Sequence, residues 1–92
     1  MDKYDQLNVI LEKAVMIIEM ISPKNSSQEE FLMKYKDYIK ALLQKCNERI
    51  LETSKGGALG LLRWLSDYYN LENYDALWDV IESAEDYYSH NF

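Results

Sequence analysis

The chain has 92 residues, of which 48% are apolar and 28% charged, a composition typical of one globular domain, residues 1–92, and not of a disordered segment. Its net charge of −6 is unevenly distributed, because residues 1–65 hold all ten Lys and Arg residues and residues 66–92 hold seven acids and no Lys or Arg. This balance argues against direct binding of nucleic acid, and no apolar run is long enough to span a membrane.

The first predicted helix covers residues 2–21. Its apolar residues recur at i, i+3, i+4 and i+7, the spacing of one buried helix face. Val9, Met16 and Met20 widen this apolar arc, so we expect neighbouring helices on more than one side. The helix ends at Ser22-Pro23, because a residue that precedes proline is pushed out of the helical region.

The second predicted helix covers residues 28–53 and begins with a capping box, in which Ser27 and Glu30 each satisfy a backbone N–H. Its five acids and five bases are mixed, as on an ordinary solvated helix face. The Lys55-Gly56-Gly57 segment predicts the stop, since glycine readily adopts the left-handed conformation that closes a helix. The expected buried seam consists of Leu32, Tyr35, Ile39, Leu42, Cys46 and Ile50.

Two further helices are predicted over residues 58–69 and 74–89. The first of them is apolar on nearly all sides, which indicates burial between other helices. Gly60 within it predicts a close approach of another backbone; a phosphate-binding role is the alternative, but the lysine and preceding strand of a P-loop are missing. Asn73 is the predicted N-cap of the last helix. Together these patterns predict an all-α, four-helix, bundle-like domain without strands. The apolar face of the last helix consists of Tyr74, Leu77, Trp78, Ile81, Ala84 and Tyr88.

An acidic stripe follows a 3-4-3-4 spacing in the last third of the chain, which places its members on one face of a helix. Like charges at these spacings repel each other, so helix stability does not account for a stripe without interleaved bases. A solvated face that keeps a small protein soluble is one interpretation, and a surface that meets a positively charged partner is the other. The stripe consists of Glu72, Asp75, Asp79, Glu82 and Asp86.

Aromatic residues are concentrated in the same region, where residues 64–92 contain eight of the twelve in the chain. Trp78 lies at the border between the apolar face and the acidic stripe. Tyr and Trp are the residues most enriched at the energetic centres of protein interfaces. Adjacent helical residues point about 100° apart, so at least one of Tyr68, Tyr69 and Tyr87 is expected to be exposed.

Residues that could form an active site or a metal site are scarce. The single histidine, His90, lies close to the C-terminus, and the single cysteine, Cys46, is expected to be a buried, inert thiol. The Cys and His clusters of zinc sites, calcium loops and the Glu-x-x-His motif are absent. We therefore expect no catalytic, cofactor-binding or metal-binding residues. The N-terminal segment lacks the features of a signal peptide, which predicts a cytoplasmic protein.

The run from Tyr68 to Asp79, about an eighth of the chain, resembles the inhibitory helix of the barstar family, intracellular inhibitors of a secreted bacterial ribonuclease. In that family two aspartates of the helix enter the cationic active site of the nuclease, and the resemblance implies this role for Asp75 and Asp79. The α/β fold of the family is not implied, because the remaining sequence has no strand pattern. With one inserted residue, the match covers Tyr68, Tyr69, Glu72, Asn73, Asp75, Ala76, Leu77, Trp78 and Asp79.

These features together predict a non-enzymatic protein of the immunity or antitoxin class, which binds and neutralises a basic protein toxin, a nuclease in particular. One alternative is a helical adaptor or homodimeric structural module, because the helix at 58–69 is apolar almost all round. Another is a DNA-mimic inhibitor of a nucleic-acid-binding enzyme. Whether the protein is a monomer or a homodimer is left open. The predicted partner-binding residues are Glu72, Asp75, Asp79, Glu82, Asp86, Trp78, Tyr68 and Tyr69.

Overall fold

The computed structural model describes residues 2–55 and 57–92, which form helices and no strands. This confirms the predicted all-α domain of four helices. Gly56, part of the predicted helix stop, lies outside the described residues. The elements in chain order are α1 (Lys3–Glu19), α2 (Ser26–Glu48), α3 (Leu61–Leu65), the short 3-10 helix η1 (Ser66–Tyr68) and α4 (Tyr74–Asn91).

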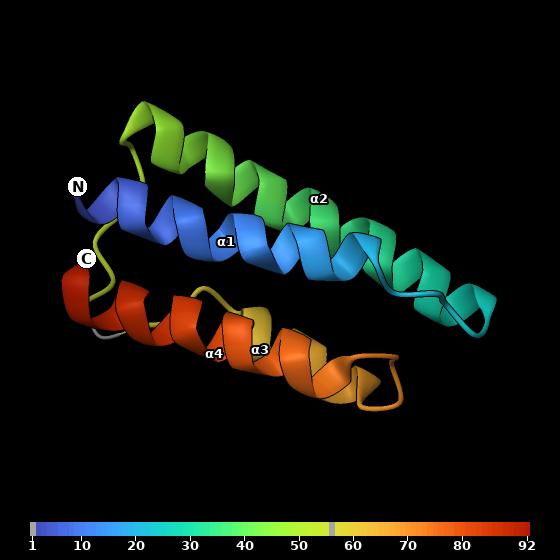
Figure 1. Ribbon diagram of the computed structural model, residues 1–92. Helices are drawn as coiled ribbons and strands as arrows, with labels where there is room; N and C mark the ends of the chain where they lie inside the picture. The colour runs from blue at the N-terminus through green and yellow to red at the C-terminus, as the bar shows by residue number, and fades with distance from the viewer. Residues whose placement is uncertain (1, 56) are drawn as a thin grey trace.

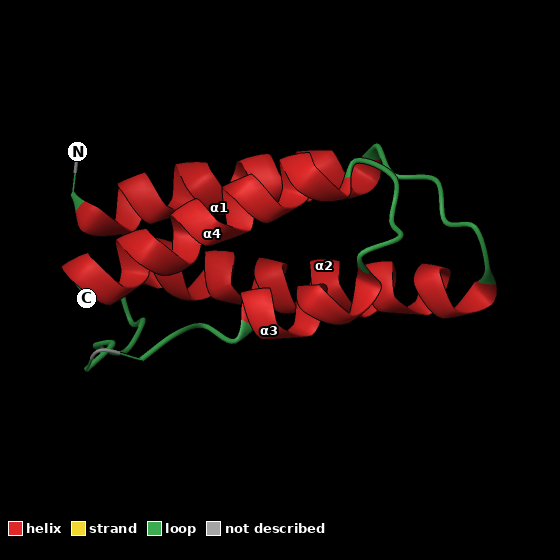
Figure 2. Cartoon of the chain, turned by 90° about the horizontal axis from the view of Figure 1, so that it is seen from below, coloured by secondary structure: helices red, strands yellow, loops and turns green. Residues whose placement is uncertain are grey.

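The helices form two layers with the core between them. In Figure 1, α1 lies between α2 and α4 and runs antiparallel to both, and it packs directly against each of them. Figure 2, turned by 90°, shows α1 and α4 in one layer and α2 and α3 in the other. Both ends of the chain lie at the same end of the bundle. The prediction that α1 has neighbours on more than one side is therefore confirmed.

The core is built from the predicted apolar faces. Leu7, Leu11 and Ala14 of α1 are fully buried, and Leu77 and Ile81 of α4 are buried against them. On α2 the predicted seam is buried except for its last member. Ile50 is 61% exposed, because the helix ends before it, and Leu51 is buried in its place.

The α2 helix begins two residues earlier and ends five residues earlier than predicted. Its N-cap is Asn25, whose side chain accepts from the Gln28 N–H at 2.9 Å, while the Gln28 side chain accepts from the Lys24 N–H at 2.9 Å. The predicted capping box at Ser27 is wrong, because a similar exchange of hydrogen bonds starts the helix two residues earlier, at Asn25. Ser27 therefore lies inside the first turn of the helix.

The C-terminal end of α2 is set by Arg49, which has the left-handed conformation with φ 56°. The N–H groups of Arg49 and Ile50 donate to the carbonyls of Cys46 and Lys45, at 3.1 and 3.0 Å. This is the Schellman arrangement, with arginine where glycine is usual. Glycine is not needed to stop this helix, so the stop predicted at Lys55 to Gly57 is wrong for α2.

The third predicted helix is shorter than expected, because residues 58–60 are not helical and residues 66–68 form the 3-10 turn. Gly60 has φ +84°, and a Cβ placed on it meets no atom within 4 Å. The prediction of a close backbone approach is therefore wrong, and the left-handed conformation explains the glycine instead. Aromatic side chains join α3 and η1 to α2, since Phe31 stacks on Tyr68 with ring centroids 3.8 Å apart.

Candidate protein-binding surface

The outer face of α4 carries the acidic ridge, which we define as Asp75, Asp79, Glu82 and Asp86. All four residues are exposed, and the opposite face of the helix is buried in the core. The 4-3-4 spacing places one carboxylate on each successive turn of the helix. The structure therefore brings these predicted site residues together on one solvent-facing surface.

Glu72 does not belong to this ridge by geometry. It lies in the turn before α4, and Asn73 between them has the left-handed conformation with φ 56°. A left-handed residue interrupts the helical register, so the prediction that Glu72 continues the helical stripe is wrong. Asn73 occupies the N-cap position, as predicted, but its side chain makes no capping hydrogen bond. Glu72 is exposed, and its role in binding stays a prediction.

The ridge carboxylates have few cationic neighbours. Among residues 2–55 and 57–92, no ion pair joins a ridge carboxylate to a Lys or Arg side chain. The Asp86 Oδ1 atom lies 3.3 Å from the Nδ1 atom of His90. This pair is exposed and is ionic only when the histidine is protonated. Lys13 of α1 lines the same surface hollow as Asp79 without forming an ion pair with it. The negative charge of the ridge is therefore left largely for solvent.

The aromatic residues near the ridge differ in exposure. Tyr69 is 69% exposed and lines a hollow with Tyr74 and Asp75. Tyr68 is half-buried, because its ring stacks on Phe31. The expectation that at least one of the three tyrosines is exposed is confirmed by Tyr69.

Trp78 lies at the boundary that was predicted for it. Its indole is half-buried and packs on the ring of Tyr74, with centroids 5.8 Å apart. This packing fixes the orientation of Trp78 while part of the side chain stays accessible. A partner that covered it would bury further aromatic area on a side chain that is already ordered.

Glu85 is the acidic residue of α4 whose function sequence reasoning missed. It is only 7% exposed, and its carboxylate accepts from three backbone N–H groups, of Leu59 at 2.5 Å, Leu61 at 3.1 Å and Leu62 at 3.3 Å. These donors lie at the start of α3, where Gly60 offers no side chain as a cap. Glu85 therefore caps α3 from another helix, and it is structural.

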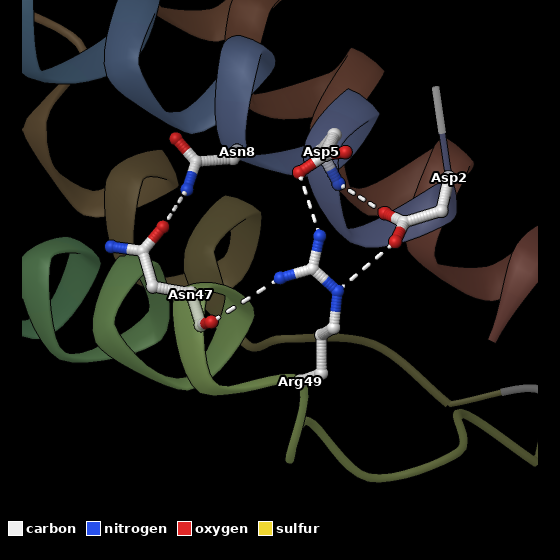
Figure 3. Close-up of polar contacts among 5 residues, drawn as sticks. All are labelled: Asp2, Asp5, Asn8, Asn47 and Arg49. Atoms are coloured by element: carbon white, nitrogen blue, oxygen red, sulfur yellow. Dashed lines mark hydrogen bonds and ion pairs between the residues drawn. The ribbon is translucent and has the colours of Figure 1, made fainter.

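A second structural cluster, shown in Figure 3, lies at the end of the bundle where both chain termini are found. The Arg49 guanidinium donates to Asp2 at 3.0 Å and to Asp5 at 3.1 Å, and so joins the end of α2 to the start of α1. Asn8 donates to Asn47 beside it at 2.6 Å. Asp2 also caps α1 by accepting from the Asp5 N–H, and this bond together with Arg49 lowers the pKa of Asp2. These ion pairs connect the left-handed residue at the end of α2 to the first turn of α1.

The remaining candidate groups for chemistry do not assemble into a site. Cys46 is buried, as predicted, and burial raises the pKa of its thiol, which makes it a poor nucleophile. Among the described residues, no group of three or more His, Cys, Asp and Glu side chains could hold a metal ion. No helix in the same part of the chain has the length and apolar content needed to cross a membrane.

Comparisons with known proteins assign no function to this surface. The chain matches no protein-family model, and neither curated proteins nor solved structures give a significant match.

Proposed function

We propose that this protein is a cytoplasmic, non-enzymatic inhibitor of the immunity class, which binds a basic protein toxin through the acidic ridge. A nuclease is the class of toxin that fits best, because its active site must attract phosphate and is therefore cationic. One observation carries the proposal: four exposed carboxylates on successive turns of α4 have no Lys or Arg partner among residues 2–55 and 57–92. Such an arrangement is electrostatically unfavourable until a cationic surface covers it.

The two features of the surface would act at different steps of binding. The negative field of the ridge would accelerate encounter with a basic partner, an effect that weakens as salt is added. Trp78 and Tyr69 would then be covered, and the buried aromatic area would slow dissociation. Tyr68 contributes less, since its ring is already stacked within the domain. The local resemblance to the barstar helix supports the same role for Asp75 and Asp79.

The experiment that tests this function is charge reversal on the ridge. The toxin candidate is the product of the neighbouring gene, because immunity proteins are usually encoded beside the toxins they block. Asp75→Lys with Asp79→Lys is expected to lower the affinity for that product about a hundredfold or more, and to abolish protection of growth. The matched control is Asp37→Lys with Glu48→Lys, which changes two exposed acids of α2 by the same charge. Equal loss in both variants, or none in the ridge variant, would refute the function.

A second candidate function is supported by the exposed apolar residues of α1. Met16 and Met20 are 65% and 69% exposed, which is unusual for large apolar side chains on one helix face. A helical adaptor or homodimer could bury them. Sedimentation at low and high salt separates the two functions: a salt-insensitive dimer supports the adaptor, and a monomer that captures a basic protein only at low salt supports the inhibitor.

A further inference from the structure

The outer surface of the α1/α4 layer combines two kinds of side chain that occur side by side. On α4 it carries the acidic ridge. On α1 it carries Val9, Met16 and Met20, which are 38%, 65% and 69% exposed. Methionine side chains adapt readily to the shape of a partner and are common on binding surfaces. The surface is therefore both acidic and apolar, along two neighbouring helices.

A shallow groove separates the two helices on this surface. It consists of two adjoining hollows that share Ile10 of α1 and Ser83 of α4. Half-buried Ile10, Val80 and Tyr87 give it an apolar floor. Asp79 and Asp86 line its α4 side. We call this feature the α1/α4 groove.

We propose that the α1/α4 groove binds an amphipathic helix of the basic partner, an inference that rests on the proposed function. The apolar side of that helix lies on Ile10, Val80 and Tyr87, and its Lys or Arg residues reach the ridge. A groove between two antiparallel helices accepts a third helix by ordinary side-chain packing. An extended peptide that binds by strand addition would need a free strand edge, and residues 2–55 and 57–92 contain no strand. A second copy of this chain carries a net charge of −6 and would be repelled.

The spacing of the ridge specifies the pattern on the partner helix. Aligned helices rise equally, about 1.5 Å per residue, so Lys or Arg at i, i+4, i+7 and i+11 would face Asp75, Asp79, Glu82 and Asp86 in turn. The 4-3-4 pattern is the same in both directions, so it fits a parallel or an antiparallel partner. Lys13 lines the groove on its α1 side and opposes this charge pattern, which gives a variant that should strengthen binding.

The test uses a synthetic helical peptide of 18 residues, the length of α4. It carries Lys at i, i+4, i+7 and i+11 and Leu on the adjoining face. A second peptide of identical composition has the same Lys and Leu residues distributed evenly around the helix, so that it has neither a basic nor an apolar face in either direction. Fluorescence anisotropy measures the binding of each peptide to the intact protein. The patterned peptide is expected to bind at least about tenfold more tightly than the rearranged one. Equal binding of the two peptides overturns the inference.

Groove variants then separate this inference from the proposed function. Ser83→Trp fills the groove and keeps every ridge carboxylate. It is expected to lower the affinity for the patterned peptide about tenfold. Gln44→Trp on the exposed face of α2 is the matched control and should change nothing. Ile10→Gln provides a second test if Ser83→Trp does not fold. Lys13→Met should strengthen binding about threefold by removing the opposing charge.

Each outcome points to a different conclusion. If Ser83→Trp and Ile10→Gln bind the patterned peptide normally while Asp75→Lys with Asp79→Lys does not, the groove inference is wrong and the ridge function survives. If none of these variants changes binding, both are wrong. A dimer that Ser83→Trp dissociates would show that a second copy occupies the groove, which also overturns the inference.

Discussion

Carboxylates near the start of α1 and on the outer face of α4 have different surroundings. Asp2 and Asp5 share one guanidinium, that of Arg49, and the contact joins two helices. On α4, Asp79 and Glu82 lie on a helix of similar length but have no Lys or Arg partner in the part of the chain that the structure describes. The first pair joins two helices of the fold, whereas the ridge carboxylates face solvent.

A similar contrast exists within α4, between Glu85 and Asp86. It is one residue from Asp86, yet it is buried and accepts three hydrogen bonds, while Asp86 is exposed. The difference arises because successive residues of a helix point about 100° apart, and only Glu85 turns toward the start of α3. Variants that remove individual carboxylates should therefore have unequal effects on stability.

Replacement of Glu85 should have the largest effect. Glu85→Ala leaves the N–H groups of Leu59, Leu61 and Leu62 without their acceptor, and a buried unsatisfied donor costs about 1–3 kcal/mol. We expect a total loss of about 3 kcal/mol in the free energy of unfolding, measured by urea denaturation. Asp79→Ala is the matched control and should change stability by less than about 0.5 kcal/mol. Similar losses in the two variants would contradict the capping role.

Tyr35→Phe should have the next largest effect, because it removes the donor that satisfies the other backbone group of Leu61. The Tyr35 hydroxyl donates to the Leu61 carbonyl at 2.9 Å in a buried position. Its loss should lower the free energy of unfolding by about 1–1.5 kcal/mol at neutral pH. In a double-mutant cycle with Glu85→Ala, the two effects should couple, since both residues hold Leu61.

The same variant should also change the stability of the protein in alkali. Burial, followed by the charge of Glu85, raises the pKa of Tyr35 far above its ordinary value of 10.0. A folded pKa above the unfolded one means that this contribution is present below pH 10 and is lost as the pH rises beyond it. Urea midpoints measured on either side of pH 10 should fall less steeply for Tyr35→Phe than for the parent protein. Parallel curves would show that Tyr35 does not ionise on unfolding.

Arg49→Met should have a smaller effect on the free energy of unfolding, and this effect should depend on pH in the acidic range. The pKa of Asp2 is lowered mainly by the Asp5 N–H and then by Arg49. The stability that the ionised Asp2 contributes is therefore present above pH 3.8, its ordinary pKa, and is lost as the pH falls below that value. The difference in stability between Arg49→Met and the parent should therefore shrink between neutral pH and about pH 2. Lys40→Met, on the exposed face of α2, should show no such dependence. A difference that stays constant in acid would mean that Arg49 acts only through its backbone.

The helices and their buried faces were predictable, because apolar periodicity is a local signal. Leu77 and Ile81 are buried, as their spacing requires. Helix ends were less predictable where more than one cap was available, as at Asn25 and Ser27. The Arg49 stop was not predicted, because glycine is the usual residue at such a helix end and the ion-pair partners of Arg49, Asp2 and Asp5, are 47 and 44 residues away in the sequence.

The candidate surface shows the same division between local and tertiary information. Its exposure followed from the 4-3-4 spacing, which is local. The separate role of Glu85 did not, because it depends on where the start of α3 lies in space. A hint was present in the sequence, since Gly60 leaves a helix start without a side-chain cap.

Glu82→Gln should have the smallest effect, and the sign is its important feature. Glu82 has a like-charged neighbour at i−3 in Asp79 and at i+4 in Asp86. It therefore has two like-charged neighbours on the ridge, as Asp79 does, and it lies at the middle of α4, where the helix dipole has little effect on a charge. Neutralising it should raise the free energy of unfolding by a few tenths of a kcal/mol at low salt, with the gain disappearing at high salt. Asp75→Asn is the contrasting variant, because Asp75 lies in the first turn and favours the dipole, so its neutralisation should not stabilise the helix. If Glu82→Gln destabilises the protein at low salt, the carboxylate has a partner within the domain, and the ridge is part of the fold in the same sense as Asp2 and Asp5.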